Sequence, residues 1–504
     1  MLAWPIYLCL IGAAVQWLLP KDDAQPSRVA ALITAVSCLA CSLVGSLGFA
    51  TGSGLQTIAR VPWIAGLGVD YFLAVDGISL TLVILTGIAA TIGVLFSWNV
   101  EHRPREFFCL YLLLLAGCFG VFLSADLFLL FVFYELAIIP KYFLIAIWGS
   151  KNREYGAMKL ALYSFIGSAM VLAGLIAAYV VSGAKTFDLA QLAQASFSEA
   201  FQYWAFPVVF VGFAILAGLW PFHTWAPTGH SAAPTAASML LAGVVMKLGA
   251  YGALRVAIVL FPQGAMAWRA VFCTLGAIGI LYGALVALTQ KDLKYVIGYS
   301  SVSHMGFVLL GLATLSTIGL SGAVLQMFSH GIIGGLLFAV AGRMVYDRAH
   351  TRDLAELQRL HLNKVMPFAA VTFVLAGLAS MGIPGFSGFV AELNVLIGAW
   401  QVYPTLAVVS GTGIVIGVAY TLRMVQMTFY GVASGEAELN VAGSRELMEG
   451  DHAAPITVPE RLGALFLIAL TLLIGLYPRL LLDWIVPAFS SPLFDGLRKA
   501  GGLE

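Results

Sequence analysis

Long apolar runs separated by short polar segments account for nearly the whole chain. A helix needs roughly 17 to 25 apolar residues to cross a bilayer, and counting runs of that length predicts fourteen spans. They lie near residues 3–19, 29–50, 74–98, 107–123, 125–148, 160–182, 203–225, 235–260, 268–288, 295–315, 320–345, 366–399, 404–430 and 462–482. The pattern predicts an all-α, polytopic membrane protein.

Composition supports this class. Of 504 residues, 61% are hydrophobic and 10% are charged, and a soluble domain of this size could not bury so much apolar surface. The net charge of +1 gives no indication of a nucleic-acid partner. No basic residue precedes the first run, and no convincing cleavage site follows it, so we expect a retained helix there and not a signal peptide.

The basic residues are distributed unevenly between the two sets of loops. Loops after odd-numbered spans hold 17 of them, whereas the other side, to which Arg255 is assigned, holds 7. Cytoplasmic loops carry the excess of Lys and Arg in membrane proteins. We therefore expect a multi-pass protein of a bacterial cytoplasmic membrane, with both termini on the non-cytoplasmic side.

Two spans are interrupted by helix-breaking residues. Gly218 and Pro221 break the seventh, and Pro384, Gly385 and Gly388 break the twelfth. A broken membrane helix is tolerated where its freed carbonyls meet protein or water. The breaks are five spans apart, an odd number, which predicts two halves of opposite orientation as in inverted-repeat transporters. Two unrelated kinks are the alternative, because Pro and Gly are common in membrane helices.

Four charged residues are predicted inside spans: Glu135, Lys141, Lys247 and Glu392. Lys247 lies near mid-bilayer, where a charge costs roughly 2.5 to 3.5 kcal/mol, which favours a functional role over a side chain that reaches the interface. Burial disfavours each charged form and an opposite charge favours it, so moving one charge can shift a proton on its partner. Glu135 and Lys141 are six positions apart and would not pair on a straight helix, although Pro140 can bend it.

Histidines supply the second set of protonatable groups. His223, His230, His304 and His330 can relay protons near neutral pH, and Gln326 shares a helix face with His330. The four lie on different spans without metal-ligand spacing. They favour a proton path over a metal site.

Asp76 and Asp126 lie at span edges, where we expect interfacial positions, and Lys294 in TQKDLKYVIG is a further candidate for the path. Cys38 and Cys41 form a CxxC without a second pair or a polar turn, so we interpret the six cysteines as small core residues. No dinucleotide fingerprint or phosphate-binding loop appears in the sequence. We therefore expect no cofactor in this chain and any redox chemistry in another.

Six segments carry a family resemblance over about residues 126–430. They are YELAIIPKYFLIAIWG, PFHTWAPTGHSAAPTAASMLLAGVVMKLGAYGALR, TQKDLKYVIGYSSVSHMGFVLLG, QMFSHGII, HTRDL and GFSGFVAEL. They resemble the antiporter-like M subunits, mitochondrial subunit 4, of respiratory complex I. The resemblance implies N-terminal spans in 1–123, a first repeat in 107–260, an inverted second repeat in 268–430, and a connecting loop with the last span in 431–504.

The resemblance also implies roles. Glu135 matches the fifth-span carboxylate, Lys247 the central lysine, His304 and His330 the histidines that join the halves, and Glu392 the terminal glutamate. In the family these residues form a hydrated axis through which redox energy moves protons. Implied partners are L- and N-type antiporter-like chains, small membrane subunits and, indirectly, a peripheral NADH-oxidising arm. FMN, iron-sulfur clusters and quinone are expected in those partners only.

Three positions depart from the family pattern. Leu216 replaces a seventh-span lysine, Thr228 replaces the aspartate of a PDAH turn, and Lys141 stands where the family has an apolar residue. One hypothesis is that the switching lysine has moved from the seventh span to the fifth. The rival is a lost site in a degenerate subunit.

The favoured function is a proton-translocating subunit of a redox-driven NADH:quinone oxidoreductase. Glu135 and Lys141 would gate proton uptake, Lys247 would hold the central proton, and Glu392 would release or pass on charge. One alternative is a subunit of an Mrp-type cation/proton antiporter or of a ferredoxin- or hydrogen-linked relative. Another is an inert membrane spacer, in which Lys247→Ala would leave pumping unchanged. The electron donor and the choice between H⁺ and Na⁺ stay open.

Overall fold

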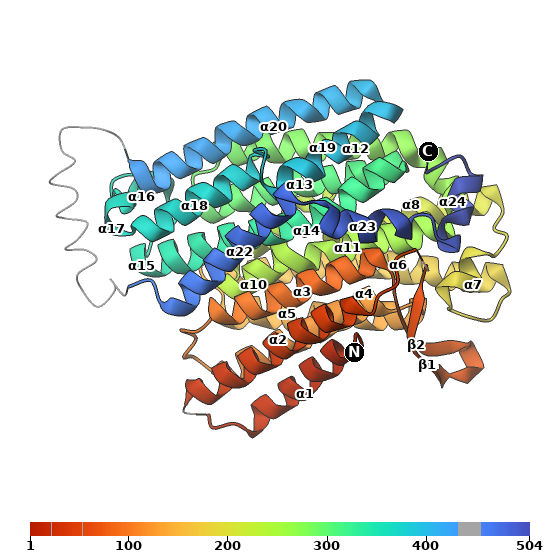
Figure 1. Cartoon of the computed structure of the whole chain (residues 1–504), viewed down its shortest axis with the longest axis horizontal. Helices are drawn as coiled ribbons and strands as arrows, with labels where there is room; N and C mark the ends of the chain where they lie inside the picture. The colour runs from red at the N-terminus through yellow and green to blue at the C-terminus, as the bar shows by residue number, and fades with distance from the viewer. Residues whose placement is uncertain (22, 53, 432–454, 504) are drawn as a thin grey trace.

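The chain folds into a bundle of long helices with roughly parallel axes (Figure 1). The structure, a computed structural model, describes residues 1–21, 23–52, 54–431 and 455–503. Arg445 and most of the predicted connecting loop lie outside the described residues.

The first half of the bundle contains one hairpin and a series of helices. The hairpin consists of β1 (Gln56–Ile64), the short helix η1 (Ala65–Leu67) and β2 (Val69–Val75). The long helices are α1 (Trp4–Leu18), α2 (Ala24–Leu47), α3 (Gly77–Leu95), α4 (Pro104–Leu123), α5 (Leu127–Trp148), α6 (Arg153–Ser182) and α8 (Glu199–Ala217). Shorter segments are α7 (Leu189–Ala193), η2 (Phe222–Thr224), α9 (Trp225–Ala232), α10 (Thr235–Leu240), η3 (Leu241–Val245), α11 (Met246–Gly252) and η4 (Ala253–Ile258).

The second half is helical throughout its described part. The long helices are α12 (Pro262–Thr289), α13 (Leu293–Thr314), α14 (Thr317–Ala339), α18 (Pro367–Ser380), α19 (Ser387–Val402), α20 (Pro404–Val425) and α22 (Val458–Leu476). Shorter segments are η5 (Val340–Tyr346), α15 (Asp347–Ala349), α16 (Leu354–Leu357), α17 (Leu362–Val365), η6 (Gln426–Tyr430), α23 (Arg479–Ala488), η7 (Pro492–Phe494) and α24 (Asp495–Lys499). The segments η3, η4, η5 and η6 are π-helical.

Twelve helical runs in the described part of the chain are long and apolar enough to cross a membrane, and α1 and α18 are shorter apolar helices. The prediction of an all-α polytopic membrane protein is confirmed. The exact count of fourteen spans stays a prediction.

Both predicted breaks are present. α8 ends before Gly218, which has a φ of 89°, and the chain continues through η2 into α9. The predicted span 366–399 is divided at its predicted break into α18 and α19, with Pro384 and Gly385 between them, whereas Gly388 lies in the first turn of α19. Gly382 and Gly385 between them have φ values of 69° and 101°, which glycine adopts without a steric penalty but helices do not use.

Aspartates begin several helices by accepting hydrogen bonds from first-turn N–H groups. Asp126 and Asp188 cap α5 and α7, and Asp292 and Asp353 cap α13 and α16. The members of each pair are joined to one another by an isolated antiparallel bridge. Figure 1 shows α7 and α16 at opposite ends of the bundle, so the same connection occurs once at each end.

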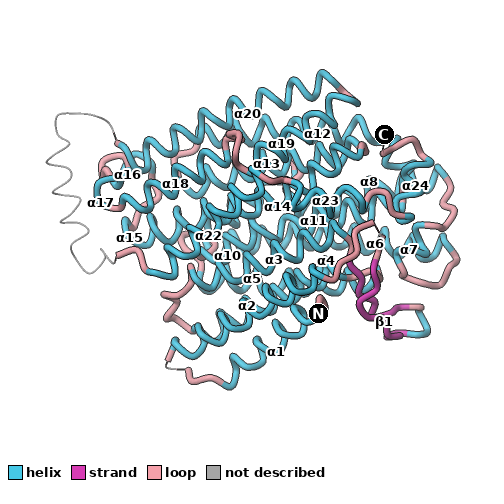
Figure 2. Tube along the Cα trace, in the orientation of Figure 1, coloured by secondary structure: helices cyan, strands magenta, loops and turns pink. Residues whose placement is uncertain are grey.

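Within the described ranges, β1 and β2 are the only strands (Figure 2). They form an antiparallel hairpin that was not expected from the sequence, where only membrane-length apolar runs were counted. Arg60 of β1 forms ion pairs with Asp70 at 2.8 Å and with Asp188 at 2.9 Å. The first pair joins the two strands, and the second fastens the hairpin to the start of α7, at the end of the bundle at which the chain begins and ends (Figure 1).

Candidate functional site

Four of the six main candidates form a chain of contacts inside the bundle, which we call the polar axis: Lys247, His330, His304 and Glu392. Lys247 on α11 is fully buried. Its Nζ donates a hydrogen bond to the carbonyl of Ala242 and lies 2.7 Å from Nδ1 of His330 on α14. The first step of the axis is therefore a direct amine–imidazole contact.

Two glycines explain how Lys247 and His330 come together. A Cβ atom on Gly331 would lie 2.8 Å from the carbonyl oxygen of Gly243, and one on Gly243 would lie 3.2 Å from that of Gly331. Only hydrogen atoms at these positions allow η3 and α14 to approach so closely. η3 is also a π-helical turn, a feature that is frequent at functional sites, and it contains the Ala242 carbonyl that accepts from Lys247.

The second step joins α13 to α19. Nδ1 of His304 lies 2.9 Å from Oε1 of Glu392, and Nε2 lies 3.1 Å from Oγ of Ser380. Gln326 donates to the same carboxylate oxygen at 3.0 Å. The sequence predicted Gln326 on the histidine face of α14, but it gave no reason to select Ser380, which ends α18 beside the second helix break.

The two imidazoles bring the steps together. The ring centroids of His304 and His330 are 5.5 Å apart. Two cavities of about 10 Å³ each adjoin His304, Ser380 and Glu392, and one of them also adjoins His330. This is about the volume that one water requires. Both ring nitrogens of His304 have partners, whereas Nε2 of His330 has none among the described residues. A water in the cavity that adjoins His330 can bond to that nitrogen and to the Glu392 carboxylate.

The charges at the two ends of the axis are balanced differently. In the described structure, no carboxylate lies within 4.0 Å of the Lys247 amine, whose hydrogen-bonding partners are a carbonyl and an imidazole. Glu392 has a histidine and an amide as partners. Lys247 and Glu392 each have one partner that can change its charge, and in each case this partner is a histidine: His330 for Lys247 and His304 for Glu392. Histidine side chains on this path suit stepwise proton transfer.

Glu135 and Lys141 lie outside the polar axis and form no ion pair within 4.0 Å of one another in the described structure, although their charges interact over a longer distance. Lys141 is fully buried, and its Nζ has no hydrogen-bond partner among the described residues. Its charged form interacts with Cys118 on α4, whereas Glu135 has Ser168 on α6 as a hydrogen-bonding neighbour. The two side chains thus face different helices. Leu216, at the family's lysine position, is a buried apolar residue on α8.

The other two predicted histidines are packed against aromatic rings. His223 lies 4.9 Å from the ring of Tyr282, and His230 lies 5.3 Å from that of Phe338, centroid to centroid. Both are buried, and their ring nitrogens have no hydrogen-bond partner among the described residues. Among the described residues, neither histidine has a hydrogen bond to the polar axis, although the charge of Lys247 acts on His230.

The interfacial positions expected for Asp76 and Asp126 stay a prediction, and within the protein each side chain is buried, with 1% exposure. Asp126 caps α5 and also accepts from the backbone N–H of Asp70 at 3.1 Å. Burial raises the pKa of Asp126, while its hydrogen bonds from backbone N–H groups lower it. The Asp126 carboxylate therefore joins the start of α5 to β2 of the hairpin.

Arg255 was assigned to a loop, which is wrong. It lies in η4, is 2% exposed, and forms a 2.6 Å ion pair with Asp76 at the start of α3. Its Nε also donates to the hydroxyl of Tyr251 at 3.1 Å. The number of charged residues inside helical runs therefore exceeds the four predicted. The sequence signal was spacing, because Tyr251 and Arg255 follow Lys247 at intervals of four residues along one helix face.

Lys294 was counted among loop residues but lies in the first turn of α13. It is 2% exposed, and its Nζ donates to the carbonyl of Ala233 at 3.0 Å. Ala233 separates α9 from α10. The predicted candidate is therefore present inside the bundle, at the end opposite the hairpin.

A helical membrane bundle with a buried series of ionisable side chains is the architecture of an ion-translocating protein. The family model described as NADH:quinone oxidoreductase/Mrp antiporter, TM, matches residues 124–417. The chain belongs to this family.

Two relatives are similar over almost the whole chain. NADH-quinone oxidoreductase subunit M of Rhodobacter capsulatus is 37% identical over 485 residues, covering 94% of this chain and 91% of the relative. NAD(P)H-quinone oxidoreductase chain 4-2 of Synechocystis sp. is 35% identical over 502 residues, and the match covers 94% of this chain and 89% of the relative.

Solved structures share the fold. A chain of respiratory complex I from Thermus thermophilus has a TM-score of 0.86 at 28% identity, covering 98% of this chain and all of that one. A chain of the Mrp complex from Dietzia sp. has a TM-score of 0.84 at 23% identity, and the match covers 99% of this chain and 98% of that one. The second likeness concerns the fold alone.

Proposed function

We propose that this chain is a proton-translocating, antiporter-like membrane subunit of a redox-driven NADH:quinone oxidoreductase. The polar axis carries the proposal, because it connects four protonatable side chains from four helices across the interior of the bundle. Identity of 35% to 37% to quinone oxidoreductase chains over almost the full length supports the redox-linked reading.

In this proposal Lys247 holds the central proton. His330, 2.7 Å away, accepts it when the positive charge on Lys247 becomes unfavourable, and passes it through a water to the pair formed by Glu392 and His304. Glu392 stabilises the protonated imidazole at 2.9 Å and hands the proton onward. Moving one charge against 100 mV costs about 2.3 kcal/mol, so a partner subunit must supply the energy.

The chain acts as a non-redox subunit of the enzyme. NADH oxidation, FMN, iron-sulfur clusters and quinone belong to partner subunits, and the membrane neighbours are L- and N-type antiporter-like chains and small subunits. The complex lies in the bacterial cytoplasmic membrane, with both termini of this chain on the non-cytoplasmic side. Without Lys294 and Arg255, which are buried in helices, the counts become 16 and 6, and this asymmetry between the two sets of loops supports that orientation.

The two inverted repeats, 107–260 and 268–430, are part of the proposal. The broken helices at Gly218 and Gly382 support them. So do the bridges between Asp126 and Asp188 and between Asp292 and Asp353, which occur at opposite ends of the bundle (Figure 1). An inverted repeat would place equivalent connections in this way.

Lys247→Met is the direct test. Replacing the amine with an apolar side chain of similar length removes the central proton carrier, so we expect loss of proton translocation while the complex still assembles. The measurement is pH-dye quenching by the purified complex in proteoliposomes, normalised to the assembled amount. Lys364→Met, on the short helix α17 and away from the polar axis, is the control. Full translocation by Lys247→Met would refute the proposal.

Lys141 and Glu135 are proposed to gate proton uptake, with Lys141 in place of the family lysine absent at Leu216. The lack of a carboxylate partner for the buried Lys141 amine in the described structure supports a charge that changes during the cycle. The test compares Lys141→Leu with the double variant that adds Leu216→Lys. Restoration of pumping in the double variant supports relocation, and no gain over the single variant contradicts it.

The composition of the complex purified through this chain separates the redox-linked function from the antiporter alternative. Recovery with an iron-sulfur, NADH-oxidising arm supports the proposal. Recovery only with small antiporter subunits would favour a secondary cation/proton antiporter. An arm that oxidises ferredoxin or hydrogen would keep the mechanism but change the electron donor.

A further inference from the structure

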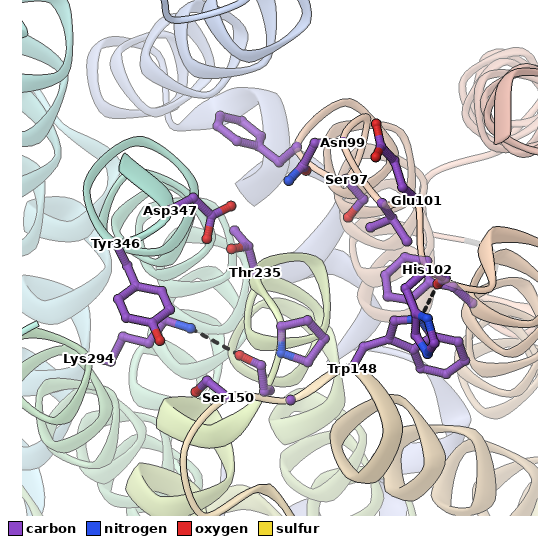
Figure 3. Close-up of a pocket in the computed structure, with 16 residues that line it drawn as sticks. Ser97, Asn99, Glu101, His102, Trp148, Ser150, Thr235, Lys294, Tyr346 and Asp347 are labelled. Atoms are coloured by element: carbon purple, nitrogen blue, oxygen red, sulfur yellow. Dashed lines mark hydrogen bonds between the residues drawn. The ribbon is translucent and has the colours of Figure 1, made fainter. Parts of the chain in front are cut away.

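The two ends of the bundle differ in how tightly they are packed. At the end opposite the hairpin, a polar pocket of about 370 Å³ is lined by Lys294 and by residues of the α3–α4 connection, the end of α5, the α9–α10 break and the η5–α15 junction (Figure 3). At the hairpin end, every residue from 247 to 261 is buried, and so is every residue from 72 to 88. The side of Lys247 that faces the hairpin is therefore packed with protein.

The helical run that carries Lys247 continues toward the hairpin with two more polar side chains. Tyr251 follows Lys247 by four residues, and Arg255, in the π-helical η4, follows Tyr251 by four. The guanidinium of Arg255 also lies against the ring of Tyr251, 5.2 Å from its centroid. Arg255 thus lies further along this run than Lys247, toward the hairpin end.

Asp76 fixes the outer side of the Arg255 guanidinium. Its Oδ1 accepts from Nη2 of Arg255 at 2.6 Å and from the backbone N–H of Ser79 at 2.9 Å. Asp76 directly follows β2, and the next residue, Gly77, packs against α23, because a Cβ atom there would collide with the carbonyl of Trp484. The carboxylate is therefore held at the base of the hairpin, and it holds the guanidinium on its inner side.

Tyr251 fixes the inner side of the guanidinium. Its hydroxyl accepts from Nε of Arg255 and donates to the carbonyl of Phe122, each at 3.1 Å. Phe122 is in the last turn of α4, where carbonyls have no donor within their own helix. The hydroxyl proton is therefore directed toward α4 and not toward Asp76.

Arginine differs from the other ionisable groups near Lys247 in that it cannot relay a proton. A relay requires a group that accepts a proton on one side and donates one on the other, as a histidine does. A guanidinium has five N–H donors and no acceptor, and it is not deprotonated in proteins. In membrane channels, an arginine can also exclude protons and other cations by its positive charge. Arg255 therefore interrupts any chain of proton transfer between Asp76 and Lys247.

An interruption at this place has a clear purpose. Oδ2 of Asp76 and Nη1 of Arg255 are buried and have no hydrogen-bond partner in the described part of the chain. Without the arginine, a carboxylate at this end of the bundle would be able to take up a proton and pass it to Lys247. The membrane potential that pumping builds up would drive protons back along such a route.

We propose that Arg255 is a proton seal between the polar axis and the hairpin end of the bundle, and that Asp76 and Tyr251 are positioning residues that hold its guanidinium. The seal keeps protons that have been pumped from returning to Lys247. It also leaves His330 as the group to which Lys247 gives its proton. The inference rests on the proposed translocation of protons, and it adds the barrier that keeps the translocation in one direction.

Passive proton flow through the assembled complex tests the seal. We expect proteoliposomes with Arg255→Gln to lose an imposed pH difference several-fold faster per complex than the wild type, because an amide can both accept and donate. The measurement uses a pH dye in the lumen, valinomycin and potassium to compensate charge, and no NADH. If the single variant does not assemble, the double variant with Asp76→Asn removes both charges and carries the same expectation.

Arg348→Gln is the matched control. Arg348, on α15 at the opposite end of the bundle (Figure 1), is also buried, and it forms an ion pair with Glu460 at 2.9 Å. Its replacement breaks a buried ion pair without opening a route from Asp76 to Lys247. We therefore expect no faster proton flow per complex, and equal acceleration by Arg348→Gln and Arg255→Gln would contradict a specific seal.

Two further variants separate a seal from a purely structural role. Arg255→Lys keeps a positive group without an acceptor beside Asp76 and should restore most of the tightness. Lys247→Met, added to Arg255→Gln, should abolish the extra flow, because the returning protons pass through Lys247. A structural role would lower the assembled amount and leave proton flow per complex unchanged. That result, an Arg255→Lys variant as permeable as Arg255→Gln, or extra flow that persists without Lys247 would overturn the proposal.

The seal and the proposed function fail in different ways. If Lys247→Met alone abolishes NADH-driven translocation and Arg255→Gln stays tight, only the seal is wrong. If Lys247→Met alone still translocates protons fully, the proposed function itself is wrong.

Discussion

At the scale of single residues, the buried charges of this protein fall into two kinds. Arg255 and Asp76 form an ion pair that is closed to water and lies 2.6 Å apart. Lys247 and Lys141 have no carboxylate within ion-pair distance among the described residues. A paired charge is held in one state by its partner, whereas an unpaired one can change its protonation without breaking an ion pair. The second kind is what a proton path requires.

The Asp76–Arg255 pair should therefore matter for stability. Asp76→Asn leaves a buried arginine uncompensated, and we expect a loss of about 3 to 5 kcal/mol in stability. The double variant Asp76→Asn with Arg255→Met removes both charges and should recover part of that loss. Thermal unfolding of the purified complex, followed by loss of this subunit, is the measurement. Equal stability of the single variant and the wild type would show that the pair contributes nothing.

At the scale of secondary-structure elements, close backbone contacts determine which side chains meet. η3 approaches α14 where Gly243 faces Gly331, and that contact sets the position of Lys247 opposite His330. Breaks play the complementary role. The turn between α18 and α19 places Ser380 and Glu392 on either side of His304. Small residues and breaks thus build the polar axis without contributing a protonatable group.

Gly331→Ala tests the contact between η3 and α14. The added methyl would lie 2.8 Å from the Gly243 carbonyl, which is backbone and cannot rotate away. We expect a cost of about 1 to 3 kcal/mol, separation of Lys247 from His330, and a marked loss of translocation per assembled complex. Gly335→Ala is the control one turn later on α14, where a methyl group meets nothing within 4 Å. Equal activity of the two variants would show that the close contact is not required.

At the scale of the whole molecule, the two ends of the bundle differ in structure. The hairpin, α7, α24 and both termini lie at one end, and the pocket and α15, α16 and α17 lie at the other (Figure 1). The basic residues are concentrated in loops at the second end, which supports the proposed cytoplasmic orientation of that end. The proposed direction of proton uptake depends on this orientation.

Reporter fusions test the orientation. Alkaline phosphatase folds only outside the cytoplasm, so fusions at Leu503 and ahead of Met1 should be active, while a fusion in the loop at Lys151 should be inactive. A fluorescent protein that folds in the cytoplasm should give the opposite pattern. Inactive phosphatase at both termini would show that the bundle has the opposite orientation in the membrane, and the proposed direction of proton uptake would then be wrong.

The sequence was sufficient for the membrane class, both helix breaks, and the residues of the polar axis. Each of these signals is local, since bilayer thickness fixes the length of an apolar run and an isolated charge in such a run is conspicuous. The hairpin escaped notice, because its strands are short and too polar to count as spans. Arg255 was misassigned because it lies near a predicted span end.

The amino-acid sequence by itself determined that this chain lies in a membrane, where its helices break, and that Lys141, Lys247 and Glu392 are buried with them. Only the tertiary structure decided which of those side chains are partners. It joined Lys247 to His330 and His304 to Glu392, left Lys141 and Glu135 facing different helices, and paired Arg255 with Asp76. The reason is physical: composition sets the cost of burying a charge, but the approach of helices distant in sequence decides what that charge meets.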